Sequence, residues 1–295
     1  MTKMLKFKIS LKFFAAPLFL IVIGLVSYCS YVAGQLSNYA DLKPVSSLAG
    51  QNRQKPIYVP AFTKQPKNRC RYSYSYDAAE TLAEYRKSEH LDSVISGCKT
   101  DFDTAVKLMH WARSQWEPGR PSPYPPINAM EILKRIRNGE TGGFCAQYCF
   151  VFVQAMQSIG YKARYVSLNG HEVSEVFLPS MNRWVCFDPL YDSYYVNENK
   201  FPLSVGKISA AYRMKKKIEM MGSRKSDSKS NHFSMFEYFA VWIKNDHVAN
   251  PINFDSIERY KVYLVNSKED IAEVSPYANH SSNFTDFYEG SWFDD

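Results

Sequence analysis

The segment between residues 145 and 188 restricts the fold of this chain more than any other feature of its sequence. It predicts one helix followed by three strands, at residues 145–158, 161–168, 171–178 and 183–188. Apolar residues recur at every third or fourth position of the helix, which Gly160 ends, and the first strand alternates between its two faces. Asn169-Gly170, between the first two strands, is the strongest hairpin signal that a short sequence offers. This order predicts an α+β fold in which the helix packs on an antiparallel sheet.

Three side chains that suit nucleophilic catalysis stand at the ends of these elements. Cys145 begins the predicted helix, His171 begins the second strand and Asp188 ends the third. Unpaired N–H groups and the helix dipole favour the thiolate form of a cysteine at a helix N-terminus, and the same N–H groups suit an oxyanion. Gly142 and Gly143, just before the helix, allow a sharp turn and the approach of a substrate. The three side chains are therefore candidates for a thiolate, a base and a group that orients the base.

The turn between the second and third strands decides whether the histidine and the aspartate meet. A turn of two or four residues brings His171 and Asp188 to the same face of the sheet, and the two-residue turn places them directly opposite each other. An antiparallel pair at that distance can share a hydrogen bond, which fixes the imidazole tautomer and stabilises the imidazolium. The two-residue turn also places Glu175 on this face, opposite Trp184.

Residues from about 102 to 200 resemble the transglutaminase-like core, a papain-related superfamily with a triad in the order Cys, His, Asp. Four motifs carry the resemblance: Gly143-Phe144-Cys145, IGYKARYV at 159–166, HEVSEVFL at 171–178 and WVCFDP at 184–189. The resemblance implies a papain/transglutaminase-like fold in which Cys145 is the nucleophile, His171 the general base and acid, and Asp188 the orienting group. It implies a thiol enzyme that acts on amide bonds of protein or peptide substrates through a thioester.

Several positions depart from the family pattern or match it loosely. Val173 stands where the family often has Trp, and Tyr161 where it often has Ile or Val, which bears on substrate preference more than on the chemistry. Trp116 is loosely similar to a tryptophan that helps to hold the oxyanion in animal transglutaminases, although a role in the core is the interpretation that we favour. Glu175 matches a glutamate of the family motif and is the second candidate for a supporting role. The calcium sites of animal transglutaminases have no recognisable counterpart, and no metal or other cofactor is implied.

The sequence leaves the reaction and two other classes of function open. Hydrolysis, as by a protease, amidase or deamidase, is favoured over amine transfer because water is always present and no acyl-acceptor feature is visible. One alternative is a catalytically inactive transglutaminase-like binding module at the membrane. The other is a structural zinc site, which is disfavoured because its cysteines form no C-x-x-C pair. Its ligands would be Cys145, Cys149, His171 and Cys186.

An uncharged apolar run from residue 13 to about residue 34 has the length of a membrane span. Four lysines precede it: Lys3, Lys6, Lys8 and Lys12. They predict that the N-terminus lies inside and that the catalytic domain lies outside the cytoplasm, anchored to the membrane. The alternative is a signal peptide cleaved near Val32-Ala33-Gly34, which yields a secreted or periplasmic protein. Export in either form makes Cys70 and Cys98 candidates for a disulfide.

The whole chain divides into four predicted parts. These are the membrane segment at 1–34, a proline-containing tether at 35–68, the catalytic core at 69–205 and a C-terminal extension at 206–295. Further helices are expected at 75–95, 101–116 and 129–138, a proline-rich loop at 117–126, strands at 236–244 and 259–265, and a mobile basic loop at 215–232. The net charge of +7 is mild, and 29 acidic residues are mixed among the basic ones. Without a basic stripe, nucleic acid is not expected as a partner.

Overall fold

The computed structural model describes residues 72–223, 231–264, 279–281 and 287–288 of the 295-residue chain. The predicted membrane segment, the tether and Cys70 lie outside the described residues. Within the described ranges, no helix is both long enough and apolar enough to span a membrane.

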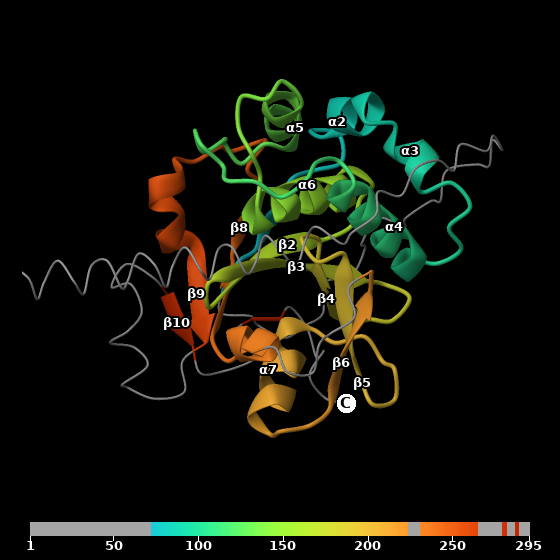
Figure 1. Ribbon diagram of the computed structural model, residues 1–295, viewed down its shortest axis with the longest axis vertical. Helices are drawn as coiled ribbons and strands as arrows, with labels where there is room; N and C mark the ends of the chain where they lie inside the picture. The colour runs from blue at the N-terminus through green and yellow to red at the C-terminus, as the bar shows by residue number, and fades with distance from the viewer. Residues whose placement is uncertain (1–71, 224–230, 265–278, 282–286, 289–295) are drawn as a thin grey trace, which may run out of the picture. The chain divides into compact units, whose positions relative to one another are not determined.

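An eight-stranded sheet forms the centre of the described part of the chain (Figure 1), with the strand order β10-β9-β7-β2-β3-β4-β5-β6. Neighbouring strands are antiparallel except β9 and β10, which are parallel. The strands are β2 (Ala163–Leu168), β3 (His171–Leu178), β4 (Arg183–Asp188), β5 (Ser193–Asn197), β6 (Ile218–Gly222), β7 (Phe239–Trp242), β9 (Lys261–Leu264) and β10 (Asn279–Ser281). A separate parallel pair joins β1 (Ser75–Tyr76) to β8 (Lys244–Asn245).

Helix α6 (Cys145–Ser158) lies on one face of the sheet, over β2 and β3, and the helices before it in the chain surround it (Figure 1). These are α2 (Ala83–Ser88), α3 (Leu91–Val94), α4 (Asp101–Arg113) and α5 (Ala129–Arg137). Helix α7 (Val205–Arg213) lies on the opposite face, and two 3-10 helices follow it, η1 (Asn231–Phe236) and η2 (Phe254–Tyr260). Because α6 is enclosed by the sheet and the other helices, every residue from Gln147 to Ser158 is buried.

The elements nearest the candidate residues agree with the sequence pattern, and the fold class is the expected α+β arrangement. The predicted bounds of α6, β3 and β4 are confirmed, and the side chain of Asn128 caps α5 by accepting a hydrogen bond from the Glu131 N–H at 3.1 Å. The helix expected at 75–95 is wrong: β1 and two short helices replace it. His90, between α2 and α3, has a left-handed φ of 51°, which interrupts a continuous helix.

The C-terminal part of the chain belongs to the same sheet as the candidate catalytic strands. Residues 218–222 form β6 at one edge, so the mobile loop expected at 215–232 is wrong over that stretch, and residues 224–230 lie outside the described ranges. The strands expected at 236–244 and 259–265 are present in shorter form as β7 and β9. Strands from both sides of the predicted boundary at residue 205 therefore share one sheet.

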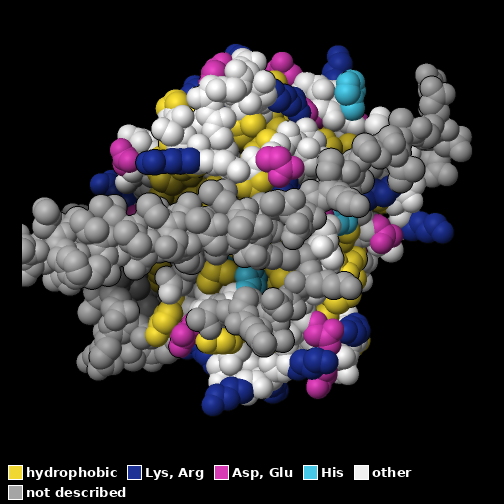
Figure 2. Space-filling model, in the orientation of Figure 1, with side chains coloured by type: hydrophobic (Ala, Val, Ile, Leu, Met, Phe, Trp, Pro, Cys, Tyr) yellow, Lys and Arg dark blue, Asp and Glu magenta, His cyan; other side chains and the backbone are white. Residues whose placement is uncertain are grey.

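Charged side chains are mixed on the surface. On the face in Figure 2, the Lys and Arg side chains of the described residues are interspersed with Asp and Glu. No patch of a single sign gathers among the described residues of that face. The absence of a nucleic-acid partner stays a prediction from the sequence.

Candidate active site

The turn between β3 and β4 has four residues, because Leu178 pairs with Arg183. Ser174 pairs with Phe187, and the register continues to Val173 and Asp188. His171 and Asp188 therefore share a face of the sheet, as a two- or four-residue turn requires, but they are diagonal neighbours rather than directly opposite. The imidazole is long enough to cross this offset.

His171 and Asp188 form a buried pair at the ends of their strands. His171 Nε2 lies 2.7 Å from Asp188 Oδ2, and the two residues are 6% and 0% exposed. Burial alone would lower the pKa of His171, but the charge and hydrogen bond of Asp188, with those of Cys145, raise that pKa well above its ordinary value. The pKa of Asp188 is lowered although burial opposes this, because His171 favours the carboxylate. The pair is therefore poised to hold an imidazolium against a carboxylate.

Cys145 is the third residue of the candidate site and lies near this imidazole. It is the first residue of α6, is partly exposed, and lies within hydrogen-bonding reach of His171. Since Asp188 occupies Nε2, Nδ1 is the ring nitrogen left for the thiol. Cys145, His171 and Asp188, from α6, β3 and β4, are thus brought together, with a hydrogen bond in place between His171 and Asp188.

The two glycines before α6 are required by close packing rather than by an unusual backbone. A Cβ on Gly142 would meet Arg120 O at 2.6 Å, and one on Gly143 would meet Trp116 Nε1 at 2.7 Å. Gly142 N–H also donates to Arg120 O, and Gly119 N–H donates to Gly143 O. The proline-rich loop is therefore held by hydrogen bonds directly beside the start of α6.

Trp116 supports this start of the helix from within the core. Its indole N–H donates to Gly143 O at 3.1 Å, and its ring stacks on Tyr148 at a centroid distance of 4.0 Å. It is 9% exposed. Because its only side-chain donor is engaged by the backbone, an oxyanion-holding role for Trp116 does not fit this geometry, and the core role that we favoured does.

Gln147 is a polar group at this helix end that the sequence analysis did not single out. Its Oε1 accepts the Phe144 N–H at 2.9 Å, which fixes the orientation of the amide. The side chain is 1% exposed, and its Nε2 makes no hydrogen bond of ordinary length among the described residues, although the amide is near enough to the Tyr124 hydroxyl to oppose the rise that burial causes in the Tyr124 pKa. Tyr124 of the proline-rich loop lies beside Gln147 and Cys145. The spacing from Cys145 to the third helical residue, where a Gln commonly folds back on the N-terminus, could have identified it.

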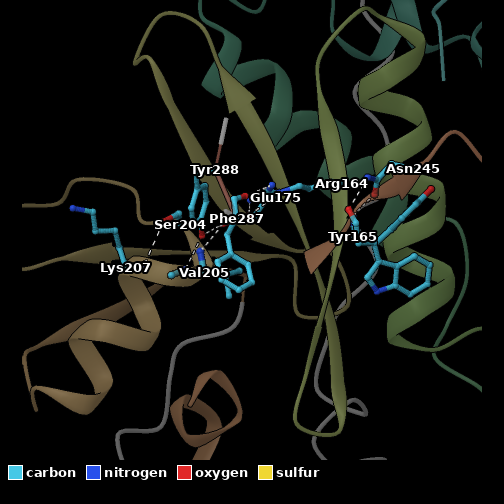
Figure 3. A network of polar contacts seen from close by, with 11 residues as sticks. Arg164, Tyr165, Glu175, Ser204, Val205, Lys207, Asn245, Phe287 and Tyr288 are labelled. Atoms are coloured by element: carbon cyan, nitrogen blue, oxygen red, sulfur yellow. Dashed lines mark hydrogen bonds and ion pairs between the residues drawn. The ribbon is translucent and has the colours of Figure 1, made fainter. Parts of the chain in front are cut away.

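Glu175 does not contact His171 but lies in a separate buried network (Figure 3). It pairs with Cys186 across β4, not with Trp184 as the two-residue turn predicted. Its carboxylate receives two hydrogen bonds from Arg164, at 2.6 and 3.0 Å, and others from Val205 N–H and the Tyr288 hydroxyl. Glu175 therefore joins the sheet to the start of α7 and to residues 287–288. The hairpin register set by Asn169-Gly170 already places Arg164 opposite Glu175 and could have revealed the pair.

Asp188 has further partners from elements that the sequence analysis did not connect with it. Its Oδ1 accepts the Tyr191 N–H at 3.2 Å, and its Oδ2 accepts the Tyr195 hydroxyl at 3.0 Å. Tyr195 in turn lies 2.7 Å from His232 Nε2 in η1. The carboxylate is thus held on both oxygens.

The other cysteines near the site are buried and separate. Cys149 Sγ donates to Glu172 O at 3.3 Å, and burial raises the pKa of both Cys149 and Cys186 well above the ordinary value. Among the described residues, no group of three or more His, Cys, Asp and Glu side chains is arranged to hold a metal ion, so the zinc alternative does not fit. Cys98 is partly exposed and forms no disulfide with another described cysteine, while its predicted pairing with Cys70 lies outside the described residues.

Comparison with known proteins agrees with this geometry. The family model described as the Transglutaminase-like superfamily matches residues 88–189. This segment is a transglutaminase-like domain. Members of that superfamily are usually cysteine enzymes, and the match includes Cys145, His171 and Asp188. No curated protein matches the chain.

The match ends one residue after Asp188, whereas the sheet continues through β5 to β10. Tyr195 and His232 therefore lie outside the part of the transglutaminase-like domain that the family pattern describes. The sequence analysis predicted no strand at 193–197, where the residues SYYVN do not alternate between polar and apolar.

Proposed function

We propose that the transglutaminase-like domain is a thiol enzyme that acts on amide bonds of protein or peptide substrates, with hydrolysis as its main reaction. The observation that carries this proposal is the position of His171, with Asp188 Oδ2 at 2.7 Å from Nε2 and Cys145 beside the same ring, which leaves Nδ1 to serve the thiol. This is the arrangement in which an imidazole both stabilises a thiolate and delivers a proton.

The first half of the reaction forms a thioester. The Cys145 thiolate attacks the carbonyl carbon of the amide, and the carbonyl oxygen becomes an oxyanion. When this intermediate collapses, the C–N bond breaks and the leaving nitrogen takes the proton from His171 Nδ1. Asp188 stabilises the imidazolium before this transfer and keeps the ring oriented after it.

The second half regenerates the enzyme. A water molecule attacks the thioester carbonyl while His171 Nδ1 takes its proton, and collapse releases the carboxylic acid product and the Cys145 thiolate. The partial exposure of Cys145 supports access of water to the thioester. An amine that replaced this water would give transfer instead of hydrolysis.

The start of α6 supplies donors for the oxyanion. The first N–H groups of a helix have no partner within the helix, and they converge where Cys145 begins α6. The Gln147 Nε2 group is a further donor, since its Oε1 is held by Phe144 N–H and Nε2 makes no hydrogen bond of ordinary length among the described residues. These groups support acyl chemistry at Cys145 rather than a purely structural cysteine.

The experiment that tests this function uses the full-length protein and a mixture of glutamine-containing peptides with an added primary amine. Mass spectrometry separates backbone cleavage, side-chain deamidation and amine incorporation in one sample. We expect cleavage or deamidation with the wild type and neither with Cys145→Ala. Equal turnover by the wild type and Cys145→Ala would refute the proposal, and absence of turnover in both would favour a binding module.

We also propose that the catalytic domain works outside the cytoplasm. The uncharged run at 13–34 and the four lysines before it support a membrane anchor, with a cleaved signal peptide as the alternative. Protease added to spheroplasts should digest the domain, whether it is anchored in the membrane or secreted and retained at the cell surface. Digestion only after lysis would contradict this location.

A further inference from the structure

Asp188 is held by a second chain of hydrogen bonds that begins outside the Cys-His-Asp arrangement. The Tyr195 hydroxyl reaches Asp188 Oδ2 at 3.0 Å, the same oxygen that receives His171 Nε2 at 2.7 Å. The other side of the Tyr195 hydroxyl lies 2.7 Å from His232 Nε2. Tyr195 is fully buried, and His232 is partly exposed. Four side chains from β3, β4, β5 and η1 are therefore linked through one carboxylate oxygen.

The direction of each hydrogen bond follows from the chemistry of the groups. A carboxylate only accepts, so Tyr195 must give its single hydroxyl proton to Asp188. Its oxygen can then only accept from His232, which must carry a proton on Nε2. Burial, together with the charge of Asp188, raises the pKa of Tyr195 well above its ordinary value, so this hydroxyl stays protonated. The chain thus runs from His232 through Tyr195 to Asp188, where it meets the proton of His171.

Aromatic rings around His232 hold its imidazole next to the candidate active site. The ring stacks on Tyr195 at a centroid distance of 5.7 Å and an angle of 19°, and it meets the Tyr191 ring edge-on at 5.2 Å. The His171 ring is 6.4 Å away. Among the described residues, the titratable groups that face His232 are Tyr195 from β5, Asp188 from β4, His171 from β3 and Tyr191 from the turn after β4. Phe233 and Phe236 of η1 enclose the ring from its own element.

We propose that Tyr195 and His232 are positioning residues, which hold the Asp188 carboxylate oriented and charged so that His171 keeps its proton on Nε2 and presents Nδ1 to Cys145. This inference rests on the proposed function only for its kinetic consequence. The hydrogen-bond chain itself makes a separate prediction about the His171 proton. A carboxylate that lost the Tyr195 donor would be free to turn and would be easier to protonate.

Matched variants test the effect of each hydrogen-bond donor separately from that of the aromatic ring that carries it. Tyr195→Phe removes only the hydroxyl, and His232→Phe removes the donor while it keeps an aromatic ring in the cluster. His232→Gln restores an N–H donor at a similar reach without a titratable ring. Tyr194→Phe is the control, because the Tyr194 ring packs on Phe102 of α4, on the face of the sheet that α6 covers.

The first measurement is the nitrogen-bound proton of His171 in NMR spectra of the protein with ¹⁵N-labelled histidine. We expect a slowly exchanging Nε2 proton in the wild type, Tyr194→Phe and His232→Gln, and a fast-exchanging one in Tyr195→Phe and His232→Phe. Thermal unfolding of each variant confirms that it is folded. An unchanged Nε2 proton in folded Tyr195→Phe would overturn the inference, whether or not a substrate is known.

The second measurement is kinetic. For Tyr195→Phe and His232→Phe we expect kcat to fall on the order of 10-fold with little change in KM, and the acidic limb of kcat/KM to move to higher pH. His232→Gln should recover most of kcat. Wild-type rates and pH profiles in both donor-deleted variants would overturn the positioning role while the proposed function stands. Failure of the proposed function is recognised separately, by turnover that survives in Cys145→Ala.

Discussion

His171 Nε2 and Asp188 Oδ2 lie 2.7 Å apart, although the strand register sets the two residues two positions away from direct opposition. The diagonal arrangement leaves Asp188 beside Tyr191 and Tyr195, so its carboxylate is held by the turn after β4 and by β5 as well as by the imidazole. The orientation of the ring therefore depends on several elements of the sheet and not on the hairpin alone.

Asp188→Asn should lower kcat strongly and move the alkaline limb of activity to lower pH. Asp188 raises the pKa of His171, and without the carboxylate the imidazolium loses its acidic proton at lower pH. The comparable change in serine proteases costs about 10⁴-fold through the wrong tautomer, and we expect a loss on the order of 10²–10⁴-fold here. The check is a pH profile of kcat/KM beside an unfolding curve. An alkaline limb that stays in place would show that Asp188 does not control His171.

Cys145 should be the first thiol to react with iodoacetamide at neutral pH. Burial raises the pKa of Cys149, Cys186 and Cys98, which keeps those thiols protonated, and the first two are also inaccessible. Cys145 is partly exposed and has His171 beside it. Peptide mapping after timed alkylation measures each site, with His171→Ala as the comparison that should slow Cys145 alone. Equal rates at Cys145 and Cys98 would remove the case for an activated nucleophile.

Gly143→Ala should destabilise the start of α6 more than Gly119→Ala. A Cβ added at position 143 would lie 2.7 Å from Trp116 Nε1, whereas one at position 119 has its nearest contact at 3.8 Å. Overpacking of this kind typically costs about 1–3 kcal/mol. Chemical denaturation of the two variants gives the difference in the free energy of unfolding. Equal free energies of unfolding would mean that the Trp116 side chain moves away from the added methyl group at little cost.

The hairpin and the helix could be predicted from the sequence because their signals are local. Asn169-Gly170 sets the register of β2 and β3, and the apolar period with Gly160 sets the end of α6. The length of the turn between β3 and β4 could not be predicted, since its four residues suit a short or a longer turn equally. Glu175 was consequently placed opposite the wrong residue.

The rest of the site depends on contacts between distant parts of the chain. His232 stands in a polar stretch that reads as a loop, and only its packing on Tyr195 brings it to Asp188. The contact of Trp116 with Gly143, which argues for a role in the core, depends on a close approach that the sequence alone does not show. Such contacts join segments that are far apart in the sequence, and no local sequence pattern predicts them.

His247 should make the fold less stable as the pH falls from about 6.5 to about 4. Its ring packs against Tyr165 and Trp242, and burial lowers its pKa to about 4. The unfolded chain, with a histidine pKa near 6.5, binds a proton in this window that the folded protein does not, so stability is lost as the pH falls. The shift corresponds to about 3 kcal/mol at its fullest. His247→Leu should flatten the pH dependence of the free energy of unfolding over this range, and a parallel curve would contradict the assignment.

The Gln147→Glu variant tests the acceptor Oε1 and the donor Nε2 of the Gln147 amide separately. The carboxylate keeps an acceptor for Phe144 N–H at a helix N-terminus, which offsets part of the cost of charging a side chain that is 1% exposed, so the variant should fold with a reduced free energy of unfolding. It loses the Nε2 donor, and loss of one oxyanion donor lowers kcat by about 10²–10³-fold. Gln147→Leu loses both groups and should show a similar kinetic loss together with reduced stability.

A negative charge beside Cys145 could itself change the reactivity of the thiol, and alkylation with neutral iodoacetamide measures that effect separately, because alkylation forms no oxyanion. The expected result for Gln147→Glu is a fall in kcat larger than any fall in the alkylation rate at the same pH. Gln147→Leu, which adds no charge, should lose kcat with an alkylation rate close to that of the wild type. A folded Gln147→Glu variant with wild-type kcat would restrict Gln147 to capping α6 and leave the oxyanion to the backbone N–H groups.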